Sequence, residues 1–302
     1  MKNIKVGLLD FGMREIKMNS LLKVQDLIEY AIYAEQLDYS RLWLAEHHIG
    51  DPTLTWNCPD SLVPIVAGMT ERIRIGVAGI LIGIHDPYHV ACNFKLYNNL
   101  YADRIDLGMA NGGVSQAVAD NTIKADKKEV HLSFERKYRE VVHFLNDEDE
   151  LFEKEQIVIP PFKGILPQVW ALGVGYGSST TRAIETGANL SRSIFHFGSD
   201  LNYEKEKLQA FKETFFLKHK RQPQINMVFS GACHQTTRKA KGIVKNLKLG
   251  YDINLVGCKN LFQDTMLSYQ ENYGIDEMIF MNVAMKPSDR ITSIELINNV
   301  LN

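Results

Sequence analysis

Continuously apolar stretches recur along the chain, and the segments between them place apolar residues at helical spacing. Continuous apolar runs are typical of parallel strands that are buried on both faces. Eight such stretches are residues 4–12, 41–46, 72–82, 104–113, 167–175, 189–197, 224–232 and 276–283. The segment after the first of them illustrates the helical spacing, because Leu27, Ile28, Ala31 and Ala34 fall on one helix face.

Eight strand–helix units in 302 residues predict an α/β fold, a closed (β/α)8 TIM barrel forming one domain over residues 1–302. The alternative is an open doubly wound sheet, but no GxGxxG follows the first strand, which argues against the dinucleotide-binding version. Two stretches exceed the minimal unit: an insertion after strand 4, at 111–130, expected to be a loop, and a small insert before strand 5, at 147–167. Within the insert, residues 156–162 are expected to form an extra strand that stops at Pro160–Pro161.

Composition and charge exclude several classes of protein. The chain is 45% hydrophobic and 23% charged, with 34 basic and 36 acidic residues and a net charge of −2. This balance gives no indication of a basic surface that would bind nucleic acid. The longest nearly apolar run has nine residues, whereas a membrane helix needs about 20. We expect no signal peptide at the N-terminus, and none of the four cysteines has CxxC spacing, so we also expect a cytoplasmic protein with reduced cysteines and no membrane segment.

In a (β/α)8 barrel the active site lies at the carboxyl ends of the strands. Polar residues at those ends are Asp10, Glu46, His47, His48, His85, Asn111 and His196. The alternative for each is a capping or loop-anchoring role. Adjacent residues of a strand point to opposite faces, so only one of His47 and His48 faces the barrel axis. The pair is therefore a poor metal site, and Pro87 between His85 and His89 marks a helix cap, so we expect no metal.

The glycine-rich stretch "LGVGYGSSTTRAIETG" joins strand 5 to the helix after it. Gly175 and Gly177 let the backbone approach a ligand closely. Ser178 and Ser179 stand at the helix start, where hydroxyls and free N–H groups favour an anion such as phosphate. The alternative is a flexible turn with a serine as a simple helix cap.

Five segments in order resemble the bacterial luciferase-like flavin-dependent monooxygenases. They are "LWLAEHH", "TERIRIGVAGILIGIHDPYHVA", "LYADRIDLGMANGG", "ALGVGYGSSTTRAIETGAN" and "GIDEMIFMNVA". The resemblance covers nearly the whole chain and implies a (β/α)8 barrel that binds reduced FMN or, in one branch, the deazaflavin F420. It implies that the FMN phosphate lies at Gly175, Tyr176, Gly177, Ser178 and Ser179.

The resemblance also implies a seat for the flavin ring near His47 and Ala78, with a non-proline cis peptide at Val77–Ala78 or Ala78–Gly79. The implied reaction uses O₂ through a C4a-hydroperoxyflavin, with His47 as the acid–base group. Glu46 orients it or holds the strand end, and the insertion at 111–130 acts as a lid that excludes water. A separate flavin reductase and a homodimer formed through the helices after strands 2 and 3 are implied as partners.

One residue departs from the family pattern, and the identity of the substrate does not follow from it. Asn111 replaces an arginine that often helps to hold the phosphate, so Arg182 or another cation takes that role or the affinity is lower. The substrate is expected to be a small molecule near Asp10 and His196, with Trp56, Phe195 or Phe197 at the mouth. Three alternatives remain: an F420-dependent oxidoreductase, a non-catalytic flavin-binding subunit and, last, a metal-dependent hydrolase.

Overall fold

The computed structural model describes residues 4–124, 126–174, 177–196 and 201–301. Eight parallel strands form a closed ring in the order β1-β2-β3-β4-β5-β6-β7-β9, with β9 paired to β1. The strands are β1 Lys5–Asp10, β2 Arg41–Leu44, β3 Arg74–Leu81, β4 Ile105–Ala110, β5 Gln168–Gly173, β6 Asn189–Ser193, β7 Ile225–Cys233 and β9 Glu277–Asn282. The predicted TIM barrel is confirmed.

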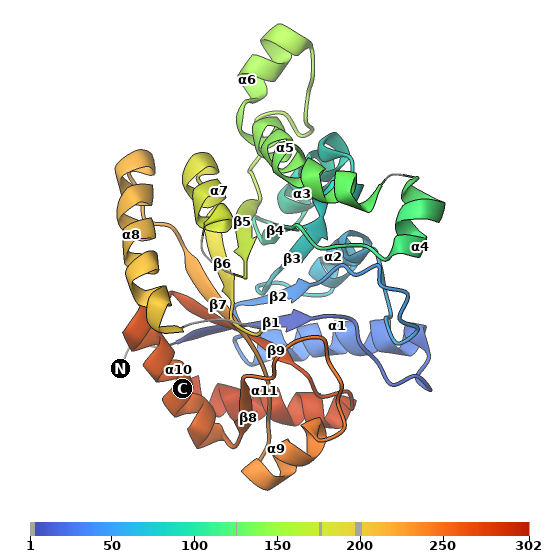
Figure 1. Ribbon diagram of the computed structural model, residues 1–302, viewed down its shortest axis with the longest axis vertical. Helices are drawn as coiled ribbons and strands as arrows, with labels where there is room; N and C mark the ends of the chain where they lie inside the picture. Colours follow the sequence, from blue (N-terminus) through green and yellow to red (C-terminus); the bar gives the residue numbers. More distant parts are fainter. Residues whose placement is uncertain (1–3, 125, 175–176, 197–200, 302) are drawn as a thin grey trace.

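Helices surround this ring (Figure 1). The longer ones are α1 Ser20–Gln36, α2 Pro59–Gly68, α3 Pro87–Leu100, α5 Lys127–Asn146, α7 Ser178–Thr186, α8 Leu201–His219, α9 Thr237–Val244, α10 Lys259–Tyr273 and α11 Pro287–Leu301. Local sequence explains several helix starts: the side chains of Asn19 and Asp86 accept hydrogen bonds from the first turns of α1 and α3, and Pro87 occupies the first turn of α3. None of the helices in the described part of the chain combines the length and apolarity that crossing a membrane requires.

Alternation along the strands sorts the apolar side chains into two clusters. One cluster fills the barrel and includes Leu9, Trp43, Trp170, Val228 and Ile279. The residues between them pack outward against the helices, as a parallel strand buried on both faces requires. This alternation decides which strand-end side chains reach the barrel mouth.

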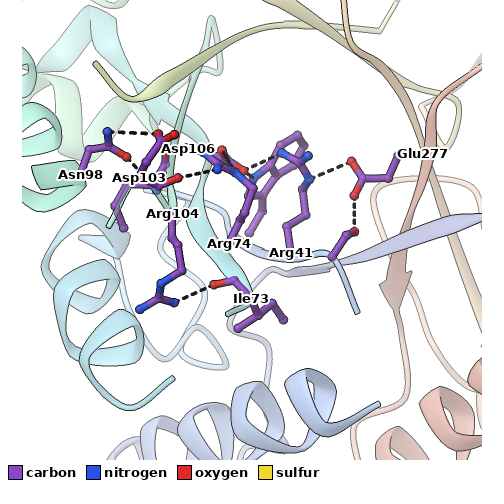
Figure 2. Close-up of polar contacts among 11 residues, drawn as sticks. Arg41, Ile73, Arg74, Asn98, Asp103, Arg104, Asp106 and Glu277 are labelled. Atoms are coloured by element: carbon purple, nitrogen blue, oxygen red, sulfur yellow. Dashed lines mark hydrogen bonds and ion pairs between the residues drawn. The ribbon is translucent and has the colours of Figure 1, made fainter. Parts of the chain in front are cut away.

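A buried ionic cluster closes the barrel at the amino ends of the strands (Figure 2). Arg41 lies between Asp106 and Glu277, with Nη1 2.6 Å from Asp106 Oδ2 and Nε 2.7 Å from Glu277 Oε2. Asp106 also accepts hydrogen bonds from Trp43 Nε1 at 2.8 Å and Arg74 Nε at 2.9 Å. The charges of this cluster are paired with one another, and the cluster closes this end of the barrel. The open space lies at the opposite end.

Three details of the elements differ from the expectation. The insertion at 111–130 is partly helical, with α4 Gln116–Val118, a π-turn at Ala119–Ile123 and α5 starting at Lys127, because Ser115 and Asp126 cap these turns. Residues 156–162 form no strand, since Pro160 and Pro161 have no N–H to donate to a ladder.

The third difference is a short additional strand outside the ring. β8, Leu255–Gly257, pairs with β7 and with no other strand of the described residues. The small insert before β5 contains α6 Glu148–Glu150 and a π-turn at Leu151–Glu155, and it projects away from the strands at the top of Figure 1.

Candidate active site

A cavity of about 600 Å³ lies at the carboxyl ends of the strands. It brings together most of the residues singled out from the sequence: Glu46, His47, Ala78, Asn111, Ser178, Ser179 and His196. Gly177 stands at the start of α7 beside the cavity. Gly175 and Tyr176 lie outside the described residues.

His47 faces this cavity because it continues the inward alternation of Arg41, Trp43 and Ala45 along β2 and beyond it. Its ring lies against that of Phe11, with centroids 4.6 Å apart. Nδ1 of His47 is buried and has no hydrogen-bond partner among the described residues. Burial lowers the pKa of the His47 imidazole, and the nearby Glu46 charge opposes this without reversing it. The ring is therefore mostly neutral at pH 7, and its Nδ1 makes no hydrogen bond to the described residues.

Glu46 holds the ends of β2 and β3 together. Its carboxylate accepts hydrogen bonds from His48 Nε2 at 2.8 Å, His85 Nε2 at 2.7 Å and the backbone N–H of Leu81 at 2.8 Å. Burial alone raises the pKa of this carboxyl, but the bonds from His48 and His85 outweigh burial and lower the pKa below its ordinary value. Of the two roles expected for Glu46, the hydrogen bonds favour the anchor, and His48 belongs to the same anchor.

A cis peptide bond joins Ala78 to Gly79 in β3, at the second of the two bonds expected. The pairing of β3 with β4 shifts register between Ala78 and Ile80. A Cβ on Gly79 would lie 2.6 Å from Leu172 Cδ1 and 2.8 Å from the carbonyl oxygen of Gly108. Only glycine fits at this point of the cavity floor.

The amino end of α7 forms another side of the cavity. Gly177, the residue before the helix, has φ +115° and provides no side-chain cap. Ser178 and Ser179 both line the cavity, and Thr180 is turned back to donate to the Gly177 carbonyl oxygen at 3.1 Å. Free N–H groups, the helix dipole and hydroxyls at one helix start form a site suited to an anion.

Arg182 stands behind this helix start and contacts the cavity, but its charge is largely committed. Its Nη1 lies 2.6 Å from Glu135 Oε1, and its guanidinium sits over the rings of Phe134 and Tyr138. Its Nε is buried without a partner among the described residues. Asn111 is exposed at the cavity rim. Arg182 thus supplies a shielded positive charge from α7 to the cavity that Asn111 also lines.

Asp10 is not part of the cavity, contrary to the expectation that it contacts substrate. It is buried in an ionic cluster with Lys23 Nζ at 3.3 Å and Arg290 Nη2 at 2.6 Å, and it accepts a hydrogen bond from the Gly12 N–H at 2.8 Å. Burial raises the pKa of the Asp10 carboxyl, but the Arg290 and Lys23 charges outweigh burial and hold it far below its ordinary value. Asp10 therefore stabilises the turn that follows β1. Trp56 is likewise a packing residue, and its Nε1 donates to the Ala45 carbonyl oxygen at 3.1 Å.

Phe11 and Tyr251, which the sequence analysis did not single out, lie beside Phe195 near β1, and Phe11 and Phe195 line the cavity. The ring of Phe11 contacts those of Phe195 and Tyr251, with centroids 5.9 Å and 5.6 Å away. His196 stacks on Phe195 at 4.5 Å, and its Nδ1 is 2.7 Å from Ser193 Oγ. The alternation that turns His47 inward also predicts an inward side chain for Phe11, two residues beyond Leu9. Tyr251 lies in a loop, where no such alternation predicts its position. Phe197 lies outside the described residues.

A family model describing luciferase-like monooxygenases matches residues 7–240. The chain belongs to this family. Among its relatives is the N-acetyl-S-alkylcysteine monooxygenase of Bacillus subtilis (strain 168), 30% identical over 193 residues, which are 64% of this chain and 56% of that enzyme. The matched stretches span little more than half the length of the first curated relatives, 55% to 57%.

Solved structures share the luciferase-like barrel over its full length. That of apo-MsnO8 has a TM-score of 0.82 at 20% identity and covers 98% of both chains. The oxygenating constituent of 3,6-diketocamphane monooxygenase from Pseudomonas putida, in complex with FMN, has a TM-score of 0.74 at 15% identity, covering 99% and 98%. An F420-dependent secondary alcohol dehydrogenase has 0.72 at 13%, covering 99% of each chain. At these identities the likeness establishes the fold alone.

Proposed function

We propose that this chain is a flavin-dependent monooxygenase that uses reduced FMN and O₂ to oxygenate a small organic substrate. One observation carries the proposal: the uncapped start of α7 and the side chain of His47, whose Nδ1 has no partner among the described residues, line the same cavity. The first suits the phosphate of a flavin nucleotide, and the second suits an acid–base group beside the flavin ring. The 3,6-diketocamphane monooxygenase, solved with FMN in the same fold, supports this choice of cofactor.

In this proposal the phosphate is bound by the hydroxyls of Ser178 and Ser179 and by the first N–H groups of α7, with Arg182 as the supporting charge. The ring lies on the floor formed by Ala78 and Gly79. Reduced flavin supplies the electrons that activate O₂. The chain's contribution is to bind and orient the cofactor and to keep water away from it.

His47 then holds or transfers a proton at Nδ1. Its imidazole is neutral at pH 7, so it accepts a proton readily, and burial keeps competing water from the nitrogen. Leu9, Ala45 and Leu172 line the cavity around it with apolar groups. A dry site with one positioned acid–base group is what oxygen transfer from a reactive intermediate requires.

The proposal includes a separate flavin reductase and a homodimer. Large apolar side chains are exposed on α2 and α3, the two helices expected to form the dimer, and at the residue that ends α2: Ile65, Leu96, Leu100 and Met69. Exposed apolar side chains on these two helices suit contact with another protein surface. We place the protein in the cytoplasm, in keeping with four cysteines that form no disulfide.

The proposal is tested by anaerobic titration of the purified protein with reduced FMN and, separately, with reduced F420, followed by admission of O₂. Tight binding of reduced FMN and a changed rate of its reoxidation support a monooxygenase. Binding of F420 alone would replace it with the F420-dependent oxidoreductase, represented in the same fold by the secondary alcohol dehydrogenase. Binding of FMN with reoxidation identical to that of free FMN would indicate a non-catalytic flavin-binding subunit.

A further inference from the structure

The cavity has two chemically different ends. The end at α7 carries Ser178 and Ser179, whereas the end at β1 is aromatic. We call Phe11, Phe195 and Tyr251 the aromatic wall, because each ring contacts the other two with centroids 5.4 to 5.9 Å apart. Phe11 and Phe195 line the cavity, and Tyr251 supports them from behind, where it lines a second cavity. β1 and β5 are four strands apart in the ring of eight, so Phe11 lies across the barrel mouth from the strand that leads into α7.

The cavity offers no uncommitted positive charge among its described lining residues. Arg182, the one lysine or arginine that lines it in the part of the chain described, is paired with Glu135 and also donates to the Leu172 carbonyl oxygen. Burial lowers the pKa of His47, and partial burial with the nearby Arg192 charge lowers that of His196, so both rings are neutral at pH 7. Residues 175–176 and 197–200 contain no lysine or arginine either.

This charge balance disfavours an anionic substrate. A carboxylate or sulfonate that entered the aromatic end would lose hydration without gaining an ion pair, and the ionised Glu46 carboxylate would repel it. Burial raises the pKa of Tyr251 to about 12, so its phenol is also uncharged. Aromatic rings around an uncharged space favour apolar or aromatic groups.

Phe11 forms a partition at this end. A second cavity of about 20 Å³ lies behind it, lined by Asp10, Met13, Tyr251 and Arg290 among others. Phe11 is the residue that lines both cavities within the described chain. Its position is fixed because the next residue, Gly12, donates its N–H to Asp10 and leaves no space beside Trp56, where a Cβ would come within 2.7 Å.

We propose that the face of the aromatic wall formed by Phe11 and Phe195 binds the substrate, that the substrate is an uncharged molecule with an apolar body, and that Phe11 limits its size. That the bound molecule is a substrate rests on the proposed function, whereas the existence of the binding site does not. The ring of His47 lies against Phe11, so a molecule on the wall places its nearest atoms beside the acid–base group.

The charge selectivity is tested with two probes of the same shape, 1-naphthylacetamide and 1-naphthylacetate, at pH 7.5. Their dissociation constants are measured by equilibrium dialysis against the purified full chain, with and without saturating FMN. We expect the neutral amide to bind at least tenfold more tightly than the carboxylate. Equal binding, tighter binding of the carboxylate, or no binding of either probe would overturn the inference.

FMN binding is measured in the same preparations by flavin fluorescence. If FMN binds and the amide does not, the substrate inference fails while the proposed function stands. If the amide binds with the expected preference and FMN does not bind, the proposed function fails and the aromatic wall remains a binding site for neutral molecules.

The size limit is tested with Phe11→Ala and the larger probe 1-pyreneacetamide. We expect the ratio of pyrenyl to naphthyl affinity to rise at least tenfold, because the partition toward the second cavity is removed. Phe11→Leu should give a smaller shift in the same direction and serves if the alanine variant does not fold. Phe152→Ala, which removes an exposed phenylalanine of the insert, should leave the ratio unchanged. An unchanged ratio in folded Phe11 variants would overturn the role of Phe11.

Discussion

Oε1 of Glu46 accepts hydrogen bonds from both His85 and His48, so two imidazoles from separate strand ends meet on one carboxylate oxygen. The other oxygen, Oε2, accepts the N–H of Leu81, three residues beyond the cis bond. Glu46 thereby links the segment that contains His47 to the floor of the cavity. Removing the Glu46 carboxylate is therefore expected to shift the residues of the site out of position rather than to remove a reacting group.

Glu46→Gln should destabilise the protein, because a buried amide replaces a carboxylate that accepts three hydrogen bonds. We expect a loss of about 2–3 kcal/mol in the free energy of unfolding, measured by urea denaturation at pH 7. Glu140→Gln, which removes one partner of an exposed pair with Arg136, is the matched control and should change it by less than about 0.5 kcal/mol. Equal effects of the two substitutions would contradict the anchor role.

The Glu46–His85 pair also predicts a pH dependence. Burial lowers the pKa of His85, but the Glu46 hydrogen bond and charge outweigh burial and raise it above its ordinary 6.5. A raised pKa contributes stability fully below 6.5 and loses it as pH rises through the folded value. The lowered pKa of Glu46 contributes stability above its ordinary 4.5 and loses it as pH falls through the folded value.

The contribution of this pair is therefore largest between about pH 4.5 and 6.5. Urea unfolding of wild type and His85→Gln at pH 5.5 and pH 8.5 isolates it, because the other titrating groups cancel in the difference between the two proteins. We expect His85→Gln to cost about 1 kcal/mol more at pH 5.5 than at pH 8.5. A penalty that is the same at both pH values would show that His85 is not charged beside Glu46.

His47 and His85 should titrate in opposite directions from the ordinary histidine pKa. Burial lowers that of His47, and Glu46 raises that of His85. Long-range ¹H–¹⁵N spectra of the histidine rings, assigned with His47→Gln and His85→Gln, give both midpoints without any substrate. The midpoint of His47 is expected below 6.5 and that of His85 above it. The reverse order would remove the argument for a neutral His47 at pH 7.

The sequence was sufficient to predict the barrel and to show that only one of His47 and His48 faces inward, whereas the choice of His47 came from the family resemblance. Continuous apolar runs identify the eight ring strands, and alternation along one strand places His47 beside Trp43 and Ala45. It was insufficient for Asp10, because the guanidinium that neutralises it belongs to Arg290, 280 residues away. Strand-end position gives no hint of such a partner. β8 was missed because three residues, Leu255–Gly257, are too short to show any period.

Asp10→Asn tests the structural role that replaces the expected substrate contact. The substitution leaves the buried charges of Lys23 and Arg290 without their shared carboxylate. We expect a loss of about 3–5 kcal/mol in the free energy of unfolding. Asp38→Asn, in an exposed pair with Arg72, should have little effect. Unchanged stability together with weakened binding of the neutral naphthyl probe would instead return Asp10 to the substrate site.

Ser178→Ala tests whether the start of α7 binds the flavin phosphate. The hydroxyl lines the cavity beside N–H groups that no side chain caps, and its loss removes a hydrogen bond to a charged group, about 1.5–3 kcal/mol. Affinity for FMN, measured by fluorescence quenching, should therefore fall about tenfold or more, whereas affinity for riboflavin, which has no phosphate, should stay unchanged. Thr181→Ala, an exposed hydroxyl on the same helix away from the cavity, should affect neither ligand. Equal weakening of FMN and riboflavin by Ser178→Ala would place the phosphate elsewhere, since only a contact with the phosphate distinguishes the two ligands.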